Sequence, residues 1–480
     1  SVRELFLVSG LGAKKVSALW ANDIDSLEEL IMAADDGRIE AIKGFSSKSA
    51  IKFKASAEFA INSKNRMRLD EAWEISEYFI DLINSKFNKE IAFEAGSFRR
   101  KLETIGDLDF IIKDLAINEL VRFLQDFVEI VKEEDNRLFA NFNGRELSFL
   151  SVDKDYFGWA WLLETGNGDY REMLLARAQS QGYRVKDWQL LKDSKLVKTT
   201  SEQEALDLLD LPYIIPERRE IAKPKPIENI IELKDIHGLV HNHSTWSDAV
   251  ANIREMLIAA QDRGYNYLAM ADHSKTSYYA NGLSIVRVYA QAKEIAEIRA
   301  ELKKQGSDFG LLHGIEVDIM TDGSLDYPDE VLASLDYTVV SVHQNFTLSK
   351  AKQTDRIIKA ISNPYASILG HLSGRLLLRR PPYEIDQDAI IDACAQTGTI
   401  IEINAHPARL DMDWRYLIKA KEKGCKFSIN PDAHETSGFD VVKFGLMMAR
   451  KAGLQAGDVV NTAPTATNFL AQLKEFPFKL

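Results

Sequence analysis

The sequence predicts an α/β multidomain protein that ends in a barrel of seven βα units. The chain has 480 residues, more than one hydrophobic core normally serves. Residues 1–65 have the pattern of helices joined by glycine turns, whereas from residue 237 short apolar strands alternate with helical stretches. Such alternation is typical of a parallel sheet, and a closed βα barrel accommodates it economically.

The composition indicates a soluble protein of a reducing compartment. Hydrophobic residues make up 45% and charged residues 28% of the chain, with no apolar run of ~18 residues and no signal peptide. Only Cys394 and Cys425 are present, which excludes a disulfide framework and indicates the cytoplasm. We expect a monomer without a membrane partner. Because Ser1 to Leu7 already has a helical pattern, we also expect that an N-terminal segment is missing.

The net charge restricts the kind of nucleic acid the chain can bind. At -12, with a pI near 5.4, the chain is unlike a protein that coats long DNA. Local contacts at a DNA end, nick or gap remain compatible with this charge. With nine histidines and two cysteines, any metal site must use nitrogen and oxygen ligands.

A glycine hairpin lies between two helical patterns in residues 1–65. Gly10 and Gly12 permit positive φ and close approach of another backbone, and Lys14 follows directly. The helix after Gly12 would direct free N–H groups outward, as phosphate-binding helix termini do. An ordinary helix cap followed by a new helix is the alternative.

The middle of the chain mixes helices and strands. Residues 66–155 contain a helix from Leu69 to Leu82 and strands at Ile91 to Phe93 and Leu108 to Ile112. Residues 156–216 have a helical pattern, and residues 217–236, rich in charge and proline, form a linker. The seven barrel strands expected after it are Leu239–Asn242, Tyr267–Ala271, Gly310–Ile315, Tyr337–Val342, Ser367–Gly370, Thr399–Asn404 and Lys426–Asn430.

Six of these strands end in a residue that can bind a metal ion. The C-terminal ends of barrel strands share one face, which carries the chemistry. In His241-Asn242-His243 the spacing places both imidazoles on one side of a strand. Imidazoles and carboxylates together suit zinc, manganese or iron. The nine candidate ligands are His241, His243, Asp248, His273, Glu316, His343, His371, Asp432 and His434.

Nine ligands are too many for one ion and imply two or three, with Glu316 as a bridge. Clustered divalent ions clamp a phosphate and convert bound water into hydroxide near neutral pH. Scattered core histidines are the alternative, which the repeated position at strand ends disfavours. His237 and His313 lie outside the pattern and are expected to be structural, whereas His406 either contacts substrate or has a loop role.

These motifs resemble the PHP (polymerase and histidinol phosphatase) domain. The segment Gly374–Arg380 resembles the PHP domain fused to bacterial X-family DNA polymerases. All nine ligand positions of that family are filled here, over residues 237 to about 475. The segments that carry the resemblance are His241–Asp248, Ala271–Ser274, Gly314–Asp318, Ile368–His371 and Asp432–His434.

The resemblance implies three divalent metal ions and 3′–5′ exonuclease chemistry on DNA ends. Glu316 would bridge two of the ions, and we expect Glu316 and Asp272 to take part in catalysis. Arg375 and Arg409 are candidates for gripping phosphate, and either could equally form a surface salt bridge. The implied groups are His241, His243, Glu316 and Asp432 for one ion, Asp248, His273 and His434 for a second, and Glu316, His343 and His371 for a third.

The N-terminal half resembles the palm and thumb of the same polymerases. The resemblance implies that Ser97 and Arg100 contact an incoming deoxynucleoside triphosphate. The alternation in Asp107-Leu108-Asp109 places two carboxylates on one face of a strand, spaced to hold two magnesium ions. The glycine hairpin then corresponds to a helix-hairpin-helix of the fingers, bound to DNA. The lyase-like domain that precedes this hairpin in the family is not expected in the given chain.

The palm also departs from the family pattern. Ser148 stands where the third carboxylate is expected, Leu163-Glu164 replaces an aromatic pair, and Arg171 replaces an asparagine. The palm is then either degenerate, or another acid serves, such as Glu146 or Asp153. Of these two acids only Glu146 shares the face of Ser148 by alternation.

We therefore predict a DNA-repair protein whose barrel degrades DNA from 3′ ends and whose palm binds DNA and nucleotide with weak or lost polymerisation. One alternative is a fully active gap-filling polymerase with an attached exonuclease, using magnesium at the palm. The other is an inert palm joined to a barrel that cleaves small phosphomonoesters.

Overall fold

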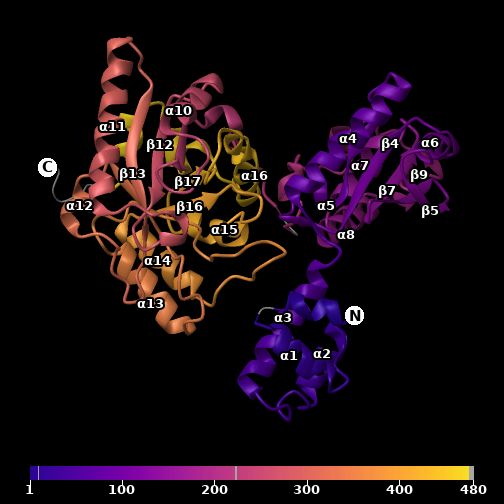
Figure 1. Cartoon of the computed structure of the whole chain (residues 1–480). Helices are drawn as coiled ribbons and strands as arrows, with labels where there is room; N and C mark the ends of the chain where they lie inside the picture. Colours follow the sequence, from indigo (N-terminus) through magenta and orange to yellow (C-terminus); the bar gives the residue numbers. More distant parts are fainter. Residues whose placement is uncertain (9, 222–223, 475–480) are drawn as a thin grey trace.

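The computed structural model describes residues 1–8, 10–221 and 224–474. A helical N-terminal lobe, a mixed palm and thumb, and a large barrel follow one another along the chain (Figure 1). Ser9 of the predicted hairpin, residues 222–223 of the predicted linker and the last six residues of the barrel range lie outside the described residues.

The N-terminal lobe has a hydrophobic core of its own, formed by residues such as Leu19, Leu30 and Phe53. Its chain begins with a 3-10 helix, which confirms the helical pattern expected before the hairpin. Gly10 adopts φ +87°, a backbone conformation that favours glycine. The helices of the lobe are η1 (Val2–Leu7), α1 (Ala13–Trp20), α2 (Leu27–Asp35) and α3 (Ser47–Ser63).

The palm is a five-stranded sheet in the order β2-β4-β7-β6-β5, with a two-stranded β1-β3 ribbon beside it. The predicted helix and two strands are present, close to their expected bounds. The strands are β1 (Met67–Arg68), β2 (Ala92–Glu94), β3 (Thr104–Ile105), β4 (Asp107–Lys113), β5 (Glu129–Glu134), β6 (Arg137–Phe142) and β7 (Arg145–Val152). The helices are α4 (Leu69–Phe87), α5 (Gly96–Arg99) and α6 (Ile117–Leu124).

The thumb corrects the expectation that residues 156–216 are helical throughout, because three short strands lie between its helices. Asp187 and Trp188 form one two-residue turn, and Asp193 and Ser194 form the other, all four with positive φ. Such turns match the twist of tight hairpins. The elements are α7 (Phe157–Thr165), α8 (Gly168–Ser180), β8 (Arg184–Lys186), β9 (Gln189–Lys192), β10 (Lys195–Leu196) and α9 (Glu202–Leu208).

The barrel is a parallel seven-stranded sheet in which each strand pairs with the next along the chain. An isolated bridge between Asn242 and Ala433 joins the first strand to the residues after the last, so the sheet is nearly closed. All seven predicted strands are confirmed. They are β11 (Gly238–Asn242), β12 (Tyr267–His273), β13 (Gly310–Asp318), β14 (Tyr337–Ser341), β15 (Ile368–Leu369), β16 (Ile400–Asn404) and β17 (Phe427–Asn430).

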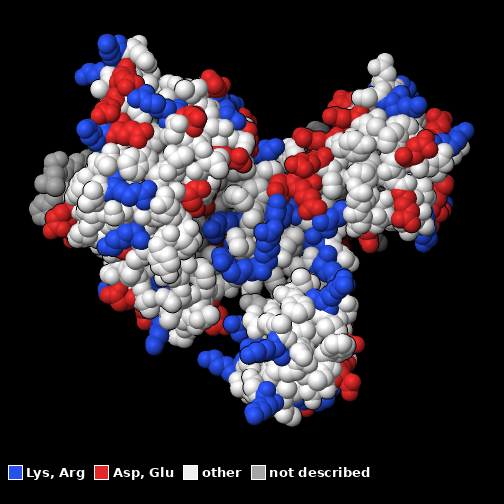
Figure 2. Space-filling view, viewed as in Figure 1, with Lys and Arg blue, Asp and Glu red and all other residues white. Residues whose placement is uncertain are grey.

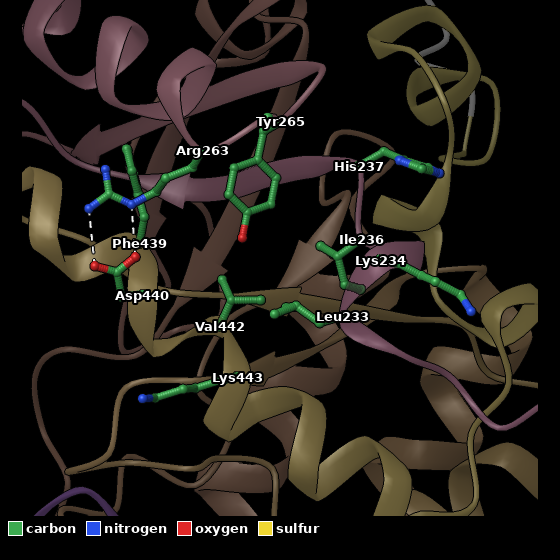
Figure 3. A pocket seen from close by; sticks show the side chains of 11 residues that line it. Leu233, Lys234, Ile236, His237, Arg263, Tyr265, Phe439, Asp440, Val442 and Lys443 are labelled. Carbon is green, nitrogen blue, oxygen red and sulfur yellow. Dashed lines mark hydrogen bonds and ion pairs between the residues drawn. The ribbon is translucent and has the colours of Figure 1, made fainter. Parts of the chain in front are cut away.

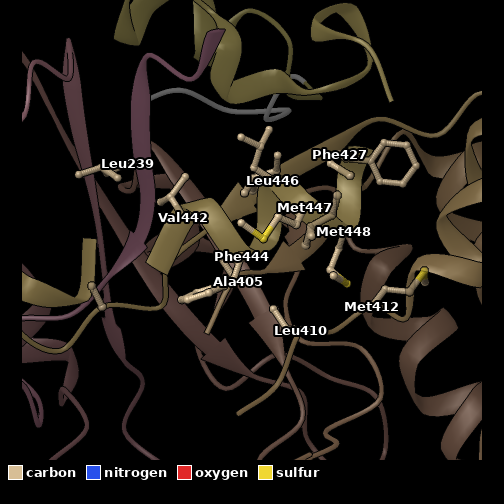
Figure 4. Packing of buried hydrophobic residues seen from close by; sticks show 14 of the residues in the cluster. Leu239, Ala405, Leu410, Met412, Phe427, Val442, Phe444, Leu446, Met447 and Met448 are labelled. Atoms are coloured by element: carbon tan, nitrogen blue, oxygen red, sulfur yellow. The ribbon is translucent and has the colours of Figure 1, made fainter. Parts of the chain in front are cut away.

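Helices cover the outside of this sheet, as Figure 1 shows for α10, α11 and α16. Phe444 and Met448 of α16 belong to the same buried cluster as Phe427 of β17 and Ala405 (Figure 4). The helices are α10 (Ile253–Asp262), α11 (Ile285–Lys304), α12 (Asp329–Ala333), α13 (Lys350–Ile361), α14 (Gln387–Thr397), α15 (Trp414–Glu422), α16 (Val442–Ala452) and α17 (Ala466–Leu470). The 3-10 turns are η2 (Pro216–Arg218), η3 (Leu233–Asp235), η4 (Tyr278–Ala280), η5 (Thr436–Val441), η6 (Ala456–Asp458) and η7 (Val460–Thr462).

Helix α16 also joins the barrel to the palm and to the segment between them. The Lys451 ammonium is buried and donates to the backbone carbonyl of Arg100 at 2.7 Å and to that of Glu217 at 3.2 Å. Burial lowers the pKa of Lys451 to about 8. Arg450 pairs with Glu217 at 2.7 Å, so the beginning of the predicted linker is docked on the barrel. In the described part of the chain, no helix has the length and apolarity to cross a membrane.

Candidate functional site

The nine predicted ligands converge at the C-terminal ends of the barrel strands. Six of them are buried, His343 and His434 are partly buried, and Asp248 is exposed. His241 and Asp432 have φ of 61° and 53°, and a register irregularity separates Leu239 from Asn242 in β11. The two imidazoles of His-x-His therefore meet with the help of a bulge that the expected alternation did not include. Bulges of this kind re-aim side chains beside active sites.

Glu316, at the end of β13, is the centre of the arrangement. Its oxygens lie 2.9 Å from His371 Nε2, 3.0 Å from His273 Nδ1 and 3.2 Å from His343 Nε2. They also lie 3.4 Å from His241 Nε2 and 3.8 Å from His243 Nε2. One carboxylate thus faces five imidazoles, which lie at or just beyond the ends of four barrel strands.

The ligand atoms form three groups that could each hold an ion. The grouping differs in part from the expected one, because His243 takes part in two groups and His273 joins Glu316 and His343. His371 contacts Glu316 without being a member of any group. The groups are His243, Asp248, His273 and His434; His241, His243 and Asp432; and His273, Glu316 and His343.

The donor chemistry fits divalent metal ions. Both oxygens of Glu316 are buried, and neither accepts a hydrogen bond of normal geometry from any described residue. The same holds for His241 Nε2 and His273 Nδ1. Buried polar atoms are rarely left without a partner, so atoms aimed together in this way are best explained by bound cations.

Two further carboxylates orient the imidazoles, and neither role was predicted from the sequence. Glu402 Oε1 lies 2.6 Å from His241 Nδ1, and Asp318 contacts His343 Nδ1. A carboxylate on the far nitrogen fixes the imidazole tautomer and raises its basicity as a metal ligand. The available signals were the two-residue spacing from Glu316 to Asp318 and the position of Glu402 on the sixth strand.

The electrostatics of the site are uneven. Burial and the neighbouring His434 and His273 lower the pKa of His243 to about 3. Burial alone would also lower the pKa of His434, but its contact with Asp248 and the charge of Asp432 raise it to about 9. Burial likewise opposes protonation of His241, yet Glu402 and Glu316 raise its pKa well above the usual value.

Of the two predicted phosphate-gripping arginines, one lies at the metal residues and one does not. Arg409 Nε is 3.6 Å from Asp432 Oδ2, and its side chain retains 21% exposure. Arg375 is buried, donates to the carbonyls of Arg409 and Leu410, and pairs with Asp413 at 3.0 Å. Arg375 therefore forms a salt bridge, which was the alternative to gripping phosphate, and its donors are used within the protein.

Asp272, predicted to take part in catalysis, lies in a buried hydrogen-bond network. It is buried and accepts hydrogen bonds from Ser244, Ser247 and Gln291. These bonds tie the loop after β11 to β12 and leave Asp272 outside the three ligand groups. The structural interpretation of His313 agrees with its 3.1 Å contact to Gln291.

In the palm, Asp107 and Asp109 share one face of β4 with Glu146 and Ser148 of β7. Parallel pairing places Asp107 beside Glu146 and Asp109 beside Ser148. Ser148 is therefore on the face where a third carboxylate would lie. Burial and the charges of Asp107 and Glu164 raise the pKa of Asp109 to about 6, although Arg137 opposes this shift.

The palm residues do not fit a pair of magnesium ions. Arg137 Nη1 lies 3.9 Å from Asp109 Oδ1 and donates to Ser148 Oγ at 2.7 Å. A cationic donor thus stands beside the carboxylates that would bind metal, and Ser148 has no charge. Magnesium requires carboxylate and water oxygens in near-octahedral geometry, and a guanidinium provides none.

The predicted nucleotide-binding pair is only partly accessible. Ser97 lies in α5 and is partly buried. Arg100 forms an ion pair with Glu220, donates to the Thr165 carbonyl at 2.9 Å, and has a side chain that is 11% exposed. The triphosphate contact expected of Arg100 would first require this ion pair to open.

The predicted DNA-binding hairpin is exposed. Gly10, Gly12 and Lys14 all lie at the surface, and Gly12 is the N-cap of α1 without a side-chain cap. The first amides of α1 therefore have no side-chain cap from Gly12, and binding of a phosphate there stays a prediction. Figure 2 shows lysine and arginine side chains gathered where the N-terminal lobe, the palm and the barrel face one another.

A separate pocket lies at the opposite end of the barrel strands (Figure 3). Its wall includes Tyr265, Ile236 and the ion pair between Arg263 and Asp440, with 2.8 Å between Arg263 Nε and Asp440 Oδ1. None of the nine ligands lines it, so the pocket is distinct from the metal residues.

Two family models match the chain. The DNA polymerase beta thumb matches residues 160–220, and the PHP domain matches residues 240–406. Fold and site together therefore define a nucleotidyltransferase-type palm and thumb joined to a PHP phosphoesterase barrel.

Whole-chain similarity identifies the family. The DNA polymerase/3′-5′ exonuclease PolX of Bacillus subtilis strain 168 is 33% identical over 474 residues, which cover 95% of this chain and 82% of the relative. The chain belongs to this PolX family. A probable phosphatase of Thermoanaerobacter sp. strain X514 is 32% identical over 235 residues, 46% of this chain and 89% of the relative. Leishmania infantum polymerase beta aligns with a TM-score of 0.31 and 19% identity, over 46% of this chain and 98% of that one.

Proposed function

We propose that the barrel is a metal-dependent 3′–5′ exonuclease that hydrolyses phosphodiesters at DNA ends, in a protein of DNA repair. The observation that carries this proposal is the buried Glu316 carboxylate, which faces five imidazoles and accepts no hydrogen bond of normal geometry among the described residues. The name of the Bacillus subtilis relative, a DNA polymerase/3′-5′ exonuclease, supports the choice of reaction.

The chain's residues would hold three divalent ions, of zinc, manganese or iron, in the three groups described above. Bound there, the ions would polarise water and a phosphate oxygen. Glu402 and Asp318 keep the nitrogens of His241 and His343 directed into the centre. Arg409, whose side chain is partly exposed beside Asp432, is placed to contact a phosphate at the rim.

We further propose that the palm and the N-terminal hairpin hold DNA while polymerisation is weak or lost. The uncharged Ser148 beside Asp109 supports weak polymerisation, because no negative ligand is added at that position. Gly10, Gly12 and Lys14 are the proposed phosphate contacts of the hairpin. We also propose that the protein is a monomer and that it is located in the cytoplasm.

A labelled duplex with a recessed 3′ end tests the exonuclease. With manganese, the chain should shorten the labelled strand, and His243→Ala should abolish the shortening because His243 belongs to two of the ligand groups. His237→Ala is the matched control, since His237 lines the pocket at the other end of the barrel. Equal inactivity of the parent and His243→Ala would exclude the proposed reaction.

A small-molecule phosphatase is the second candidate, because a probable phosphatase matches 46% of this chain at 32% identity. Hydrolysis of a small phosphomonoester such as histidinol phosphate, without cleavage of DNA, would favour it. Nucleotide incorporation on a one-nucleotide gap tests the polymerase alternative. Incorporation that Asp107→Ala abolishes would show that Ser148 does not prevent polymerisation.

A further inference from the structure

A protein cation lies among the palm carboxylates. Arg137, at the start of β6, donates from Nη1 to Ser148 Oγ at 2.7 Å and approaches Asp109 Oδ1 at 3.9 Å with the same nitrogen. Its other terminal nitrogen donates to Glu164 Oε2 at 2.7 Å. With 16% of its side chain exposed, Arg137 is largely withdrawn from solvent.

The sheet register explains how this side chain reaches the carboxylates. Strand β6 pairs antiparallel with β7, so that Arg137 is opposite Leu150 and Phe139 is opposite Ser148. Directly opposite residues of neighbouring strands share a face of the sheet. Arg137 therefore lies on the face that carries Ser148 and Asp109, one diagonal step from Ser148.

The thumb holds the guanidinium in place. Glu164 of α7 accepts from Arg137 with one oxygen and from Trp188 Nε1 with the other, the latter at 2.6 Å. The Trp188 ring lies 5.5 Å below the Arg137 guanidinium. Glu164 is one of the two residues that replace the expected aromatic pair, so the departure in the thumb and the serine in the palm belong to one network.

Arg137 supplies the one positive charge that faces both Asp109 and Glu164 among the described residues. Asp109 and Glu164 each lie within 4 Å of Arg137, and no described lysine or other arginine forms an ion pair with either. A divalent ion bound to Asp107 and Asp109 would lie beside a fixed positive charge, with Ser148 supplying no negative one. Arginine stays charged at any accessible pH, so the repulsion cannot be removed by deprotonation.

We infer that the palm works without divalent metal and that Arg137 provides the cation there. The guanidinium offers donors and a single positive charge, but it has no lone pair for activating a primer hydroxyl. The inference deepens the proposed weak or lost polymerisation, on which it rests, by naming the group that excludes metal. The palm would then bind DNA by charge and shape, without a metal ion.

Counting bound manganese tests this inference. Free Mn²⁺ is measured by its electron paramagnetic resonance signal as the full chain is titrated, for the parent and for Asp107→Asn. The parent and Asp107→Asn should bind the same number of ions, because only the barrel holds them. A smaller number in Asp107→Asn would overturn the inference.

The double variant Arg137→Ala with Ser148→Asp should gain one ion per chain, and adding Asp107→Asn should remove it again. Arg145→Ala is the matched control, since Arg145 lies at the start of β7 but pairs with Glu71 at 2.6 Å, and it should gain none. A double variant that keeps the parent's thermal unfolding profile yet gains no ion would overturn the role of Arg137. Nuclease assays on the same samples keep this result separate from the exonuclease proposal.

Discussion

The barrel and the palm each bring carboxylates close together, but the groups that surround these carboxylates differ. In the barrel, Glu316 is buried among imidazoles and accepts no hydrogen bond of normal geometry within the described chain. In the palm, Asp109 lies beside Arg137, and Glu164 is paired with the same guanidinium. The comparison teaches that the partners of an acid indicate metal binding better than the spacing of acids in sequence.

The physical reason is the cost of burying charge. A buried carboxylate without a partner costs several kcal/mol, so a fold keeps one only where a cation compensates for it. Glu316 has only imidazoles around it and no hydrogen bond of normal geometry among the described residues, so bound ions would supply that cation. Asp109 retains 23% exposure and has Arg137 at 3.9 Å, so its environment differs from that of Glu316.

The contrast extends to arginines where the palm, the thumb and the linker meet. Arg99 and Arg219 both pair with Glu202, at 2.7 Å and 2.6 Å, and all three side chains are buried. Arg100 pairs with Glu220. Arginines that could grip a triphosphate therefore hold the palm and thumb together, whereas Arg409 of the barrel remains partly exposed at the ligand rim.

The largest expected effect is that of Glu316→Gln. The amide removes the charge that faces five imidazoles, and exonuclease activity should fall about a thousandfold or more, since metal ions supply several kcal/mol of transition-state stabilisation. Metal content measured on the same sample should fall as well. The exposed Glu330→Gln is the control. Full activity of Glu316→Gln would show that the Glu316 charge is not needed, contrary to the role given to it in the barrel.

The next largest effect is expected at the buried triad of Arg99, Glu202 and Arg219. Glu202→Gln leaves two buried arginines without a counter-charge and should lower the free energy of unfolding by about 3 kcal/mol. Urea unfolding, monitored by hydrogen exchange at α9, measures this free energy of unfolding. The exposed Glu204→Gln should cost much less. A cost below that of Glu204→Gln would mean that the triad contributes nothing.

The same triad predicts a pH dependence with a definite sign. Burial alone would raise the pKa of Glu202, but Arg219 and Arg99 outweigh it and lower that pKa from 4.5 to about 2. A depressed carboxyl pKa stabilises the folded state above the unfolded value. The difference in stability between the parent and Glu202→Gln should therefore be full above pH 4.5 and shrink as the pH falls toward 2. A difference that grows on acidification would contradict this.

A smaller effect is expected from Glu402→Gln, which tests the groups behind the ligands. The amide keeps the shape but loses the charge that orients and polarises His241, so metal affinity should fall about 10- to 100-fold. Competition with a chelator measures the affinity. Asp388→Asn, at the exposed ion pair with Lys419, is the control. Unchanged affinity would restrict the metal centre to its direct ligands.

The sequence allowed the seven barrel strands and the convergence of nine ligands to be predicted, because strand periodicity and strand ends are local signals. The thumb strands were missed, since turns such as Asp187-Trp188 depend on backbone conformations that a helical pattern hides. The contacts of Arg375 and Asp272 were not predicted, for another reason. Their partners, Asp413 and Gln291, are brought to them only by the fold.

The palm shows the same limit more sharply. Ser148 could be identified as a departure from the sequence alone, and the strand register bears out its place beside Asp109. Arg137 could not, because the acids next to it in sequence, Glu133 to Asp135, are not the carboxylates that it contacts. Its role depends on the pairing of β6 with β7 and on Glu164, which lies 27 residues further along the chain.

The smallest effect is expected at the N-terminal hairpin, where the described residues include neither a buried acid nor an arginine paired with one. Lys14 is exposed beside the free amides of α1, so its charge is available to one phosphate. Lys14→Ala should weaken binding to a gapped duplex by a few-fold and lower the slope of log affinity against log salt by about 0.9, the value for one lost phosphate contact. Fluorescence anisotropy at several salt concentrations measures both, with the exposed Lys234→Ala as control. If the slope is unchanged while binding weakens, Lys14 supports the hairpin and contacts no phosphate.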